Sequence, residues 1–231
     1  MCSYDGAQFH GYQAQASLRT VQGVLLEAFS KLALPRNPNV AGRTDRGVSA
    51  HGQVLSFKLD GATELDALRD QLNAALPADV RMHQLAWAAN DFHAAWSATG
   101  REYRYRVDSL ATVDSGLLKE AIALATGAHD FRVFHHKTSD QRLRTLHTLE
   151  VVDGALRFVG DSFGRHQVRM LTAALLGVAR GEISLGTFSD ALEKQVEFGC
   201  PIADPLPLSL WAVLYPASID PFARSGVTGA S

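Results

Sequence analysis

The sequence is poor in cysteine and has no long hydrophobic run. Its 231 residues include only Cys2 and Cys200, too few for a disulfide framework, which favours a reducing compartment, the cytoplasm. No stretch approaches the roughly 18 apolar residues of a membrane-spanning helix, and no N-terminal signal peptide is recognisable. With 46% hydrophobic residues, the chain is expected to fold around one large core or two small ones.

Metal-binding and cofactor-binding patterns are also missing. The nine histidines form no H-E-x-x-H motif, and two cysteines cannot supply a pair of C-x-x-C units. The adjacent residues His135 and His136 have poor geometry for sharing a metal ion. We therefore expect no metal, and the absence of a Gly-rich fingerprint leads us to expect no nucleotide cofactor.

Charge of neither sign dominates, since the net charge is −2. A protein coated in RNA over its whole surface is therefore not expected. The distribution is uneven: residues 1–58 contain six Lys/Arg and three acids, whereas the chain from Glu182 onward contains six acids and two bases. A local basic cleft on a nearly neutral body can still attract phosphates, so charge alone leaves RNA binding open.

The first part of the chain predicts the element order β-α-β-β-α-β. Its strands are expected at the very start, from Val40, over residues 53–59 and over residues 80–87. Its helices are expected to begin after caps at Thr20 and Thr63 and to end before Pro35 and Pro77. The apolar residues of both segments recur at helical spacing.

The second part predicts the same order without repeating the sequence. Strands are expected over residues 101–108, 148–152, 155–159 and 208–215, and helices near 115–126, 165–180 and 188–195. In the first of these strands Tyr103 and Tyr105 alternate with Arg104 and Arg106. Asp153-Gly154 is typical of a two-residue type I′ hairpin turn.

Two successive βαββαβ units predict an α+β fold of two ferredoxin-like halves. Joined edge to edge, the halves would form one broad, mainly antiparallel sheet, with helices on one face and a cleft for a long ligand on the other. We expect the N-terminal half at residues 1–98 and the C-terminal half at 99–216. Residues 217–231 are rich in Gly, Ala and Ser and are predicted to be a disordered tail.

The segment most suited to chemistry is N-V-A-G-R-T-D-R-G-V-S-A-H-G-Q-V, residues 39–54. It sets the carboxylate of Asp45 between two arginines and three glycines, and glycine allows a close approach of backbone to ligand. A neighbouring guanidinium, such as that of Arg43, would keep a carboxylate ionised and oriented. A polar, Gly-rich surface turn is the competing interpretation of so short a pattern.

This segment resembles the motif G-R-T-D-x-G-V-H-A-x-G-Q-V of the TruA-type tRNA pseudouridine synthases, with Ser49 in place of the usual histidine. Other segments resemble the same family: Y-D-G-A-Q-F-H-G-Y-Q at the start, R-E-Y-R-Y, F-G-R-H-Q-V-R-M and P-L-P-L-S-L-W-A-V-L-Y. Within them Tyr12, Gln167 and Pro207 depart from the residues usual in the family. Most of the family's first hydrophobic strand is absent.

The resemblance implies that the protein converts uridine to pseudouridine in the anticodon stem-loop of tRNA, without a cofactor and as a homodimer. It implies that Asp45 is the catalytic residue and that Tyr103 stacks on the target uracil. Arg43 and Arg169 would hold the aspartate or the nucleotide, and Leu208 would line the pocket. Whether Asp45 attacks C6 of the base, attacks C1′ of the sugar or removes a proton is left open, since each route uses an ionised oxygen.

A basic loop between residues 134 and 144 is a second candidate RNA contact. We expect Arg132, Lys137, Arg142 and Arg144 to bind the phosphate backbone, although scattered solvated charge would give the same pattern. Two other functions stay open: a non-catalytic RNA-binding or RNA-folding protein that keeps the fold, and a carboxylate enzyme acting on a free nucleoside or sugar.

Overall fold

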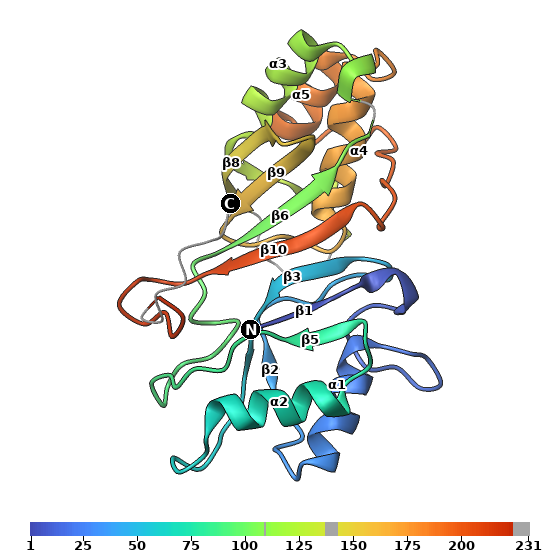
Figure 1. Cartoon of the computed structure of the whole chain (residues 1–231). Helices are drawn as coiled ribbons and strands as arrows, with labels where there is room; N and C mark the ends of the chain where they lie inside the picture. The colour runs from blue at the N-terminus through green and yellow to red at the C-terminus, as the bar shows by residue number, and fades with distance from the viewer. Residues whose placement is uncertain (109, 137–142, 224–231) are drawn as a thin grey trace. The chain divides into compact units, whose positions relative to one another are not determined.

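The structure is a computed structural model that describes residues 1–108, 110–136 and 143–223. The described residues form a mixed α/β protein with five α-helices and a large, mostly antiparallel sheet (Figure 1). The chain divides into two compact units, Met1–Thr99 with Ala212–Ser231, and Gly100–Trp211. Each unit is described separately below.

The first unit is built on a short central strand. β1 (Cys2–Tyr4) lies between β3 (Ser49–Gln53) and β5 (Val80–Met82) and is antiparallel to both. A separate pair is formed by β2 (Asn39–Val40) and β4 (Leu55–Ser56). Cys2 and Tyr4 are buried and Ser3 is only half-buried, so one face of β1 points into the core.

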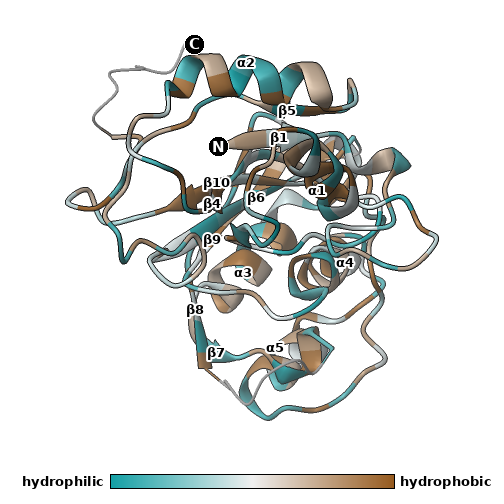
Figure 2. Cartoon of the chain, turned by 90° about the horizontal axis from the view of Figure 1, so that it is seen from below, coloured by the Kyte–Doolittle hydropathy of each residue, from teal (hydrophilic) through white to brown (hydrophobic). Residues whose placement is uncertain are grey.

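The two helices of the first unit begin near the predicted positions. α1 (Val21–Lys31) is capped by Thr20, whose hydroxyl accepts a hydrogen bond from the N–H of Gly23. α2 (Leu65–Ala75) begins after Glu64, so the prediction of a Thr63 cap is wrong. The backbone N–H of Thr63 instead donates to Asp60 in a turn. Helix α2 contains both hydrophobic and hydrophilic residues (Figure 2), and its Leu68 and Leu72 are buried.

Two strands are shorter than their patterns predicted. The strand expected over residues 80–87 ends at Met82, and the one expected over 53–59 is replaced by β3 and β4. A strand requires a hydrogen-bonded neighbour, and β1, which pairs with both β3 and β5, begins only at Cys2. Residues 57–59 and 83–88 lie past the N-terminal end of β1 and therefore have no part of this strand beside them.

The strands of the second unit follow one another in the order β10-β6-β9-β8-β7. Its strands are β6 (Gly100–Arg106), β7 (Gly127–Asp130), β8 (Leu143–Val152), β9 (Ala155–Gly160) and β10 (Leu208–Leu214), the last reaching into the first unit. Its helices are α3 (Ser115–Ala125), α4 (Gln167–Ala179) and α5 (Leu185–Glu193). β7 was not among the predicted strands.

The β8–β9 hairpin confirms the predicted turn. Val152 pairs with Ala155, and the two residues between them, Asp153 and Gly154, have φ angles of 49° and 75°. Positive φ at both central positions is the mark of a type I′ turn, whose twist suits a two-residue hairpin. The local sequence therefore sets the register of this pair.

The core of the second unit lies between the sheet and its helices. Tyr103 and Tyr105 of β6 pair with Phe158 and Leu156 of β9, and Leu156 and Phe158 are fully buried. Helix α4 is the most enclosed helix, with Leu171 at 0% exposure. At its end Gly181 has a φ of 72°, the left-handed conformation expected of a helix stop.

Part of the segment assigned by composition to a disordered tail has a defined fold. Backbone hydrogen bonds from Ile219 and Asp220 to the carbonyl of Pro216 form a turn. Phe222 then packs against a buried cluster that contains Ala41 and Val54. An aromatic ring can therefore anchor a segment whose overall composition is typical of disorder. Residues 224–231 lie outside the described residues.

Neither cysteine forms a disulfide: both Cys2 and Cys200 are free. Among the helices in the described part of the chain, none has the length and apolar character needed to span a membrane.

Candidate active site

The loop that carries Asp45 connects β2 to β3 in the first unit. Asp45 is half-buried and Arg43 is exposed. The carbonyl of Asp45 accepts a hydrogen bond of 3.1 Å from the N–H of Val48, which closes a tight turn. Gly47 within this turn has a φ of 80°, so a residue with a Cβ atom would be strained there.

A buried glutamine holds the beginning of this loop in place. Gln53 is 0% exposed, and its Nε2 donates to the carbonyl of Gly42 at 2.6 Å and to the hydroxyl of Tyr4 at 3.2 Å. The Tyr4 hydroxyl in turn lies 2.8 Å from Oγ1 of Thr44, the residue before Asp45. This chain of hydrogen bonds fixes the backbone on the N-terminal side of the carboxylate.

A second loop, residues 5–12, packs against the Asp45 loop. The N–H of Tyr12 donates to the carbonyl of Thr44 at 3.0 Å, and the N–H of Gly47 donates to the carbonyl of Phe9 at 3.2 Å. Gly11 has a φ of 91°, and a Cβ atom there would lie 3.1 Å from the Thr44 carbonyl oxygen. The segment that follows the Y-D-G motif therefore supports the Asp45 loop from outside it.

Ser49, which departs from the family motif, has a structural role. Its Oγ accepts a hydrogen bond of 3.0 Å from the N–H of Gly6. Gly6 lies so close to the Asp45 loop that a Cβ atom there would approach the Val48 carbonyl oxygen to 2.2 Å. The hydroxyl thus joins the two loops at their tightest contact.

Tyr12, the second departure, lies in the same region. Its side chain is buried, and its hydroxyl has no hydrogen-bond partner among the described residues. Burial, with the nearby Cys2 and Tyr4, raises the pKa of Tyr12 far above its usual value, whereas Arg43 acts in the opposite direction.

In the second unit, Tyr103 is half-buried and its ring meets that of Phe163 edge-on, with centroids 5.2 Å apart. Tyr105 is 7% exposed and belongs to the core. Burial, followed by the charge of Asp204, raises the pKa of Tyr105, and Arg169 opposes that shift. The two tyrosines predicted on one face of β6 therefore have different environments, and Tyr103 is the more accessible.

Arg169 and Leu208 are linked through one segment of backbone. Nε of Arg169 donates to the carbonyl of Ala203 at 2.8 Å, and the N–H of Ala203 donates back to the carbonyl of Arg169 at 3.2 Å. A few residues on, the N–H of the buried Leu208 donates to the carbonyl of Pro205 at 3.0 Å. The segment before β10 therefore holds the Arg169 side chain from α4.

The other two departures from the family also make structural contacts. Gln167, 1% exposed, begins α4, and its Oε1 accepts a hydrogen bond of 2.7 Å from the N–H of Gly164. The carbonyl of Pro207 accepts one of 3.1 Å from the N–H of Arg106. Both residues satisfy backbone groups beside the positions predicted to bind substrate.

The basic loop is not uniformly exposed. Arg132 is on the surface and forms an ion pair with Asp130 at 2.8 Å. Arg144 is only 3% exposed, and its guanidinium lies 3.0 Å from Nε2 of His135. Burial lowers the pKa of both Arg144 and His135. Arg144 is therefore poorly placed for the predicted phosphate contact, while Lys137 and Arg142 lie outside the described residues.

The Arg144–His135 contact defines a histidine tautomer. A guanidinium only donates, so Nε2 of His135 must accept. Its Nδ1 then carries the hydrogen and donates to the carbonyl of His136 at 3.1 Å. Arg144 and His135 are therefore both engaged in hydrogen bonds within the protein, and this allows the basic side chain of Arg144 to be buried.

The opposite face of β6 carries an ion network that the sequence did not predict. Glu102 is 6% exposed and accepts hydrogen bonds from Arg104 at 2.8 Å and Arg157 at 3.0 Å. The guanidinium of Arg104 lies 3.9 Å from the ring centre of Trp211. Burial alone would raise the pKa of Glu102, but the hydrogen bonds from Arg157 and Arg104 outweigh it and lower the pKa. In the sequence, the only indication of this network was that Arg104 and Arg106 alternate with tyrosines along the strand.

The predicted site residues thus fall into two groups. Asp45 and Arg43 share one loop of the first unit, whereas Tyr103, Arg169 and Leu208 belong to the second. In the part of the chain that the structure describes, no three His, Cys, Asp or Glu side chains form a group that could hold a metal ion. The first group offers a carboxylate on a rigid loop, and the second an accessible aromatic ring and a tethered guanidinium.

The chain is similar to known proteins along most of its length. Residues 121–216 match the family model described as tRNA pseudouridine synthase. A tRNA pseudouridine synthase A of Chloroflexus aurantiacus is 35% identical over 246 residues, covering 95% of this chain and 88% of the relative. A tRNA pseudouridine synthase A of Geobacillus kaustophilus is 36% identical over 237 residues, covering 92% of this chain and 92% of the relative. One of Listeria welshimeri is 32% identical over 239 residues, covering 92% of this chain and 96% of the relative.

Identity at this level over nearly the whole of both chains places this protein in the tRNA pseudouridine synthase family, among relatives named tRNA pseudouridine synthase A. The resemblance first seen in the Asp45 motif is confirmed.

Proposed function

We propose that the protein is an isomerase that converts uridine to pseudouridine in tRNA, with Asp45 as its catalytic residue. Membership of the family supports the reaction and the substrate. The observation that carries the role of Asp45 is its loop: hydrogen bonds of Gln53, Tyr4 and Tyr12 fix the backbone around a half-buried carboxylate. Preorganised groups of this kind lower the cost of reaching a transition state.

The reaction moves the glycosidic bond of uridine from N1 to C5 of the same base. The bond from C1′ to N1 breaks, the base rotates, and a bond from C1′ to C5 forms while the proton on C5 is lost and N1 gains one. Asp45 assists as a nucleophile at C6 or C1′, or as a base. Each role needs the ionised carboxylate.

The proposal assigns contacts with the uridine to the second group of residues as well. Tyr103 presents its half-buried ring to the uracil, and stacking of a base on an aromatic ring contributes about 1–3 kcal/mol. Arg169, held by Ala203, fixes the position of Asp45 or the nucleotide, and Leu208 forms part of the wall. Extruding the uridine from the RNA stack would allow it to reach such a site.

The fold proposed to bring them together is that of two ferredoxin-like halves, residues 1–98 and 99–216, joined into one broad sheet with a cleft. The strand orders within the units support it. β10-β6-β9-β8 corresponds to the order 4-1-3-2 of a βαββαβ unit, and β5-β1-β3 corresponds to 4-1-3. The anticodon stem-loop as target, a homodimer and a cytoplasmic location belong to the same proposal. Arg132 remains the described candidate for a phosphate contact.

The test is the variant Asp45→Asn, which removes the charge and keeps the shape. Unmodified tRNA labelled with tritium at C5 of uracil releases the label only when the isomerisation occurs. We expect the variant to release none while binding tRNA as the parent does. Asp91→Asn, a change at an exposed aspartate, is the matched control and should keep full activity. Tritium release by Asp45→Asn would exclude its catalytic role.

A parent protein that binds tRNA and releases no tritium would instead support the non-catalytic alternative. That alternative drew on the departures Ser49 and Gln167. Because both make defined structural hydrogen bonds, neither is a sign of a decayed site. Competition by tRNA but not by uridine would separate the proposed enzyme from one acting on a free nucleoside.

A further inference from the structure

An exposed tryptophan of the first unit has no role in the site described above. Trp96 lies in the loop between β5 and β6, and its residue is 85% exposed. In the described stretch from residue 88 to residue 99 it is the only large hydrophobic side chain that is exposed. Its neighbours in the sequence, Ala95 and Ser97, are small. Along this loop, Trp96 therefore presents one isolated aromatic ring to the solvent.

The ring of Trp96 has a fixed orientation. It stacks on the imidazole of His93, with ring centroids 4.1 Å apart and ring planes 11° from parallel. Nδ1 of His93 accepts hydrogen bonds from the N–H of Ala95 at 3.1 Å and from that of Trp96 at 3.3 Å. The N–H of His93 donates to Oγ of Ser97 at 2.9 Å, and the N–H of Ser97 donates back to the carbonyl of His93 at 2.9 Å. One face of the indole is thus covered by a ring that the loop itself holds, and the other face is open to solvent.

The same loop is anchored in the core of the unit. Ala94 is 0% exposed and belongs to the buried cluster of Ala41 and Val54. Its N–H donates to Oγ of Ser56 at 3.1 Å, and its carbonyl accepts a hydrogen bond of 2.7 Å from the hydroxyl of Tyr215. A backbone held in this way keeps the nearby indole in the solvent instead of letting it collapse onto the protein.

The anchor of Trp96 is also connected to the loop that carries Asp45. Ser56, which binds the anchored backbone, pairs with Asn39 where β4 meets β2. Strand β2 ends at Val40, and the Asp45 loop follows it. The two loops are therefore attached to one pair of strands in the same unit, and an RNA bound at one can be held by the other.

The size of the exposed surface favours RNA over a protein as the partner. A stable protein interface buries about 800 Å² on each side, whereas a tryptophan side chain supplies at most about 250 Å². A nucleobase is flat and covers a single ring face, and unpaired bases of RNA loops commonly stack on aromatic side chains. A ring that is already oriented loses little side-chain freedom on binding. The family to which the chain belongs acts on tRNA, which contains such loops.

We propose that the exposed face of Trp96 stacks on an unpaired base of the tRNA, other than the uridine that reacts. The inference rests on the proposed function for its ligand, tRNA, and adds a binding contact outside the candidate active site. It gives Trp96 no part in the chemical step.

The first test is the variant Trp96→Ala. We expect tRNA binding to weaken roughly 5- to 150-fold, the effect of one stacked base. In the tritium-release assay KM should rise by a similar factor and kcat should stay unchanged, because the contact is the same before and during the reaction. The slope of log affinity against log salt should stay that of the parent, because stacking neutralises no phosphate. Since the side chain is exposed, the unfolding midpoint should not change either.

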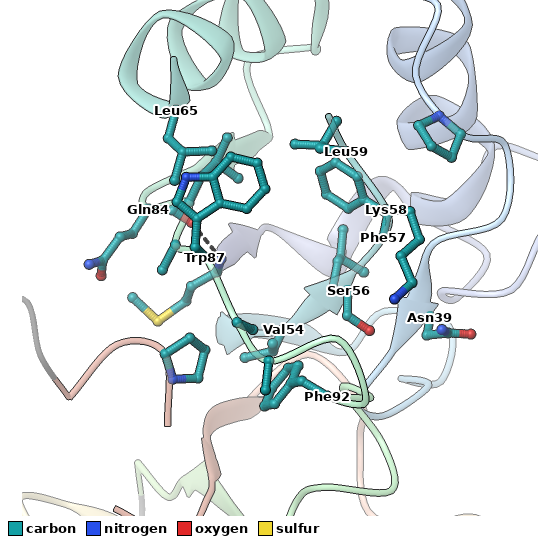
Figure 3. A pocket seen from close by; sticks show the side chains of 18 of the residues that line it. Asn39, Val54, Ser56, Phe57, Lys58, Leu59, Leu65, Gln84, Trp87 and Phe92 are labelled. Atoms are coloured by element: carbon teal, nitrogen blue, oxygen red, sulfur yellow. Dashed lines mark hydrogen bonds between the residues drawn. The ribbon is translucent and has the colours of Figure 1, made fainter. Parts of the chain in front are cut away.

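The neighbouring tryptophan supplies a matched control. Trp87 is 50% exposed and lines a pocket of about 330 Å³, where Figure 3 shows it with Leu65 of α2. Trp87→Ala should bind tRNA as the parent does. Trp96→Phe, which keeps a flat ring, should retain most of the affinity that Trp96→Ala loses.

Fluorescence reports the contact directly. The chain has three tryptophans, so the double variant Trp87→Phe, Trp211→Phe leaves Trp96 as the only one. Adding tRNA should quench its emission and protect the ring from acrylamide, because a stacked base covers the open face. Free uridine at the same concentration should do neither.

Three results would overturn the proposal. They are unchanged tRNA affinity in Trp96→Ala, emission of Trp96 that tRNA does not quench, and a change in the sedimentation of free Trp96→Ala with tRNA affinity retained. The last would assign the ring to a contact with another protein chain. A parent protein that binds tRNA and releases no tritium would refute the proposed function, while the binding and fluorescence measurements would still decide the role of Trp96.

Discussion

Nε2 of Gln53 donates a hydrogen bond of 2.6 Å to the carbonyl oxygen of Gly42, three residues before Asp45. Through this contact a fully buried side chain of β3 fixes the backbone of the Asp45 loop. The chemistry proposed for Asp45 requires a fixed carboxylate. The relationship therefore connects the packing of the first unit to its proposed activity.

Replacing Gln53 with leucine should impair activity and stability together. The change leaves the buried carbonyl of Gly42 without its donor, which costs about 1–3 kcal/mol. We expect a lower kcat with tRNA affinity little altered, because the loop loses its position while the RNA-binding surface is kept. Steady-state tritium release and thermal unfolding measure the two effects. Gln13→Leu, at an exposed position, should change neither.

Gly6→Ala should separate the two loops around Asp45. A Cβ atom at Gly6 would lie 2.2 Å from the Val48 carbonyl oxygen, so the backbone must move. We expect a loss of stability of about 1–3 kcal/mol, as for other overpacked sites, and a loss of activity. Gly61→Ala is the control, since a Cβ atom there meets nothing within 4 Å. Similar unfolding midpoints for the two variants would contradict this account.

The ion network on β6 predicts a dependence of stability on pH. The pKa of Glu102 is lower in the folded protein than in the unfolded chain. Its contribution is therefore complete above the unfolded pKa and is lost as pH falls through the folded pKa. The unfolding temperature of the parent should drop in acid more steeply than that of Glu102→Gln. Parallel pH profiles would show that Glu102 has no such role.

The two described arginines near the basic loop should behave differently on substitution. Arg132→Ala, at an exposed position, should weaken tRNA binding and reduce the slope of log affinity against log salt by about one. Arg144→Met should instead lower the unfolding temperature, because it leaves His135 without its donor. Arg69→Ala on α2 is a control expected to leave tRNA binding unchanged. An unchanged salt slope for Arg132→Ala would remove it from the RNA interface.

Local patterns were enough wherever the determining interactions are local. Thr20 caps α1, Asp153-Gly154 forms its hairpin turn, and Gly181 ends α4, since each depends on a few neighbouring residues. The motif around Asp45 led to the correct family for the same reason. These features follow from dihedral preferences and short-range hydrogen bonds.

The amino-acid sequence by itself determined the family, the helices and the loop that carries Asp45. Only the tertiary structure decided where β3 and β5 end, because a strand exists only beside a partner and β1 is short. It also decided that Gln53 supports the loop and that Arg144 is buried rather than presented to RNA. Pairing and burial depend on residues distant in the chain, and no local pattern contains them.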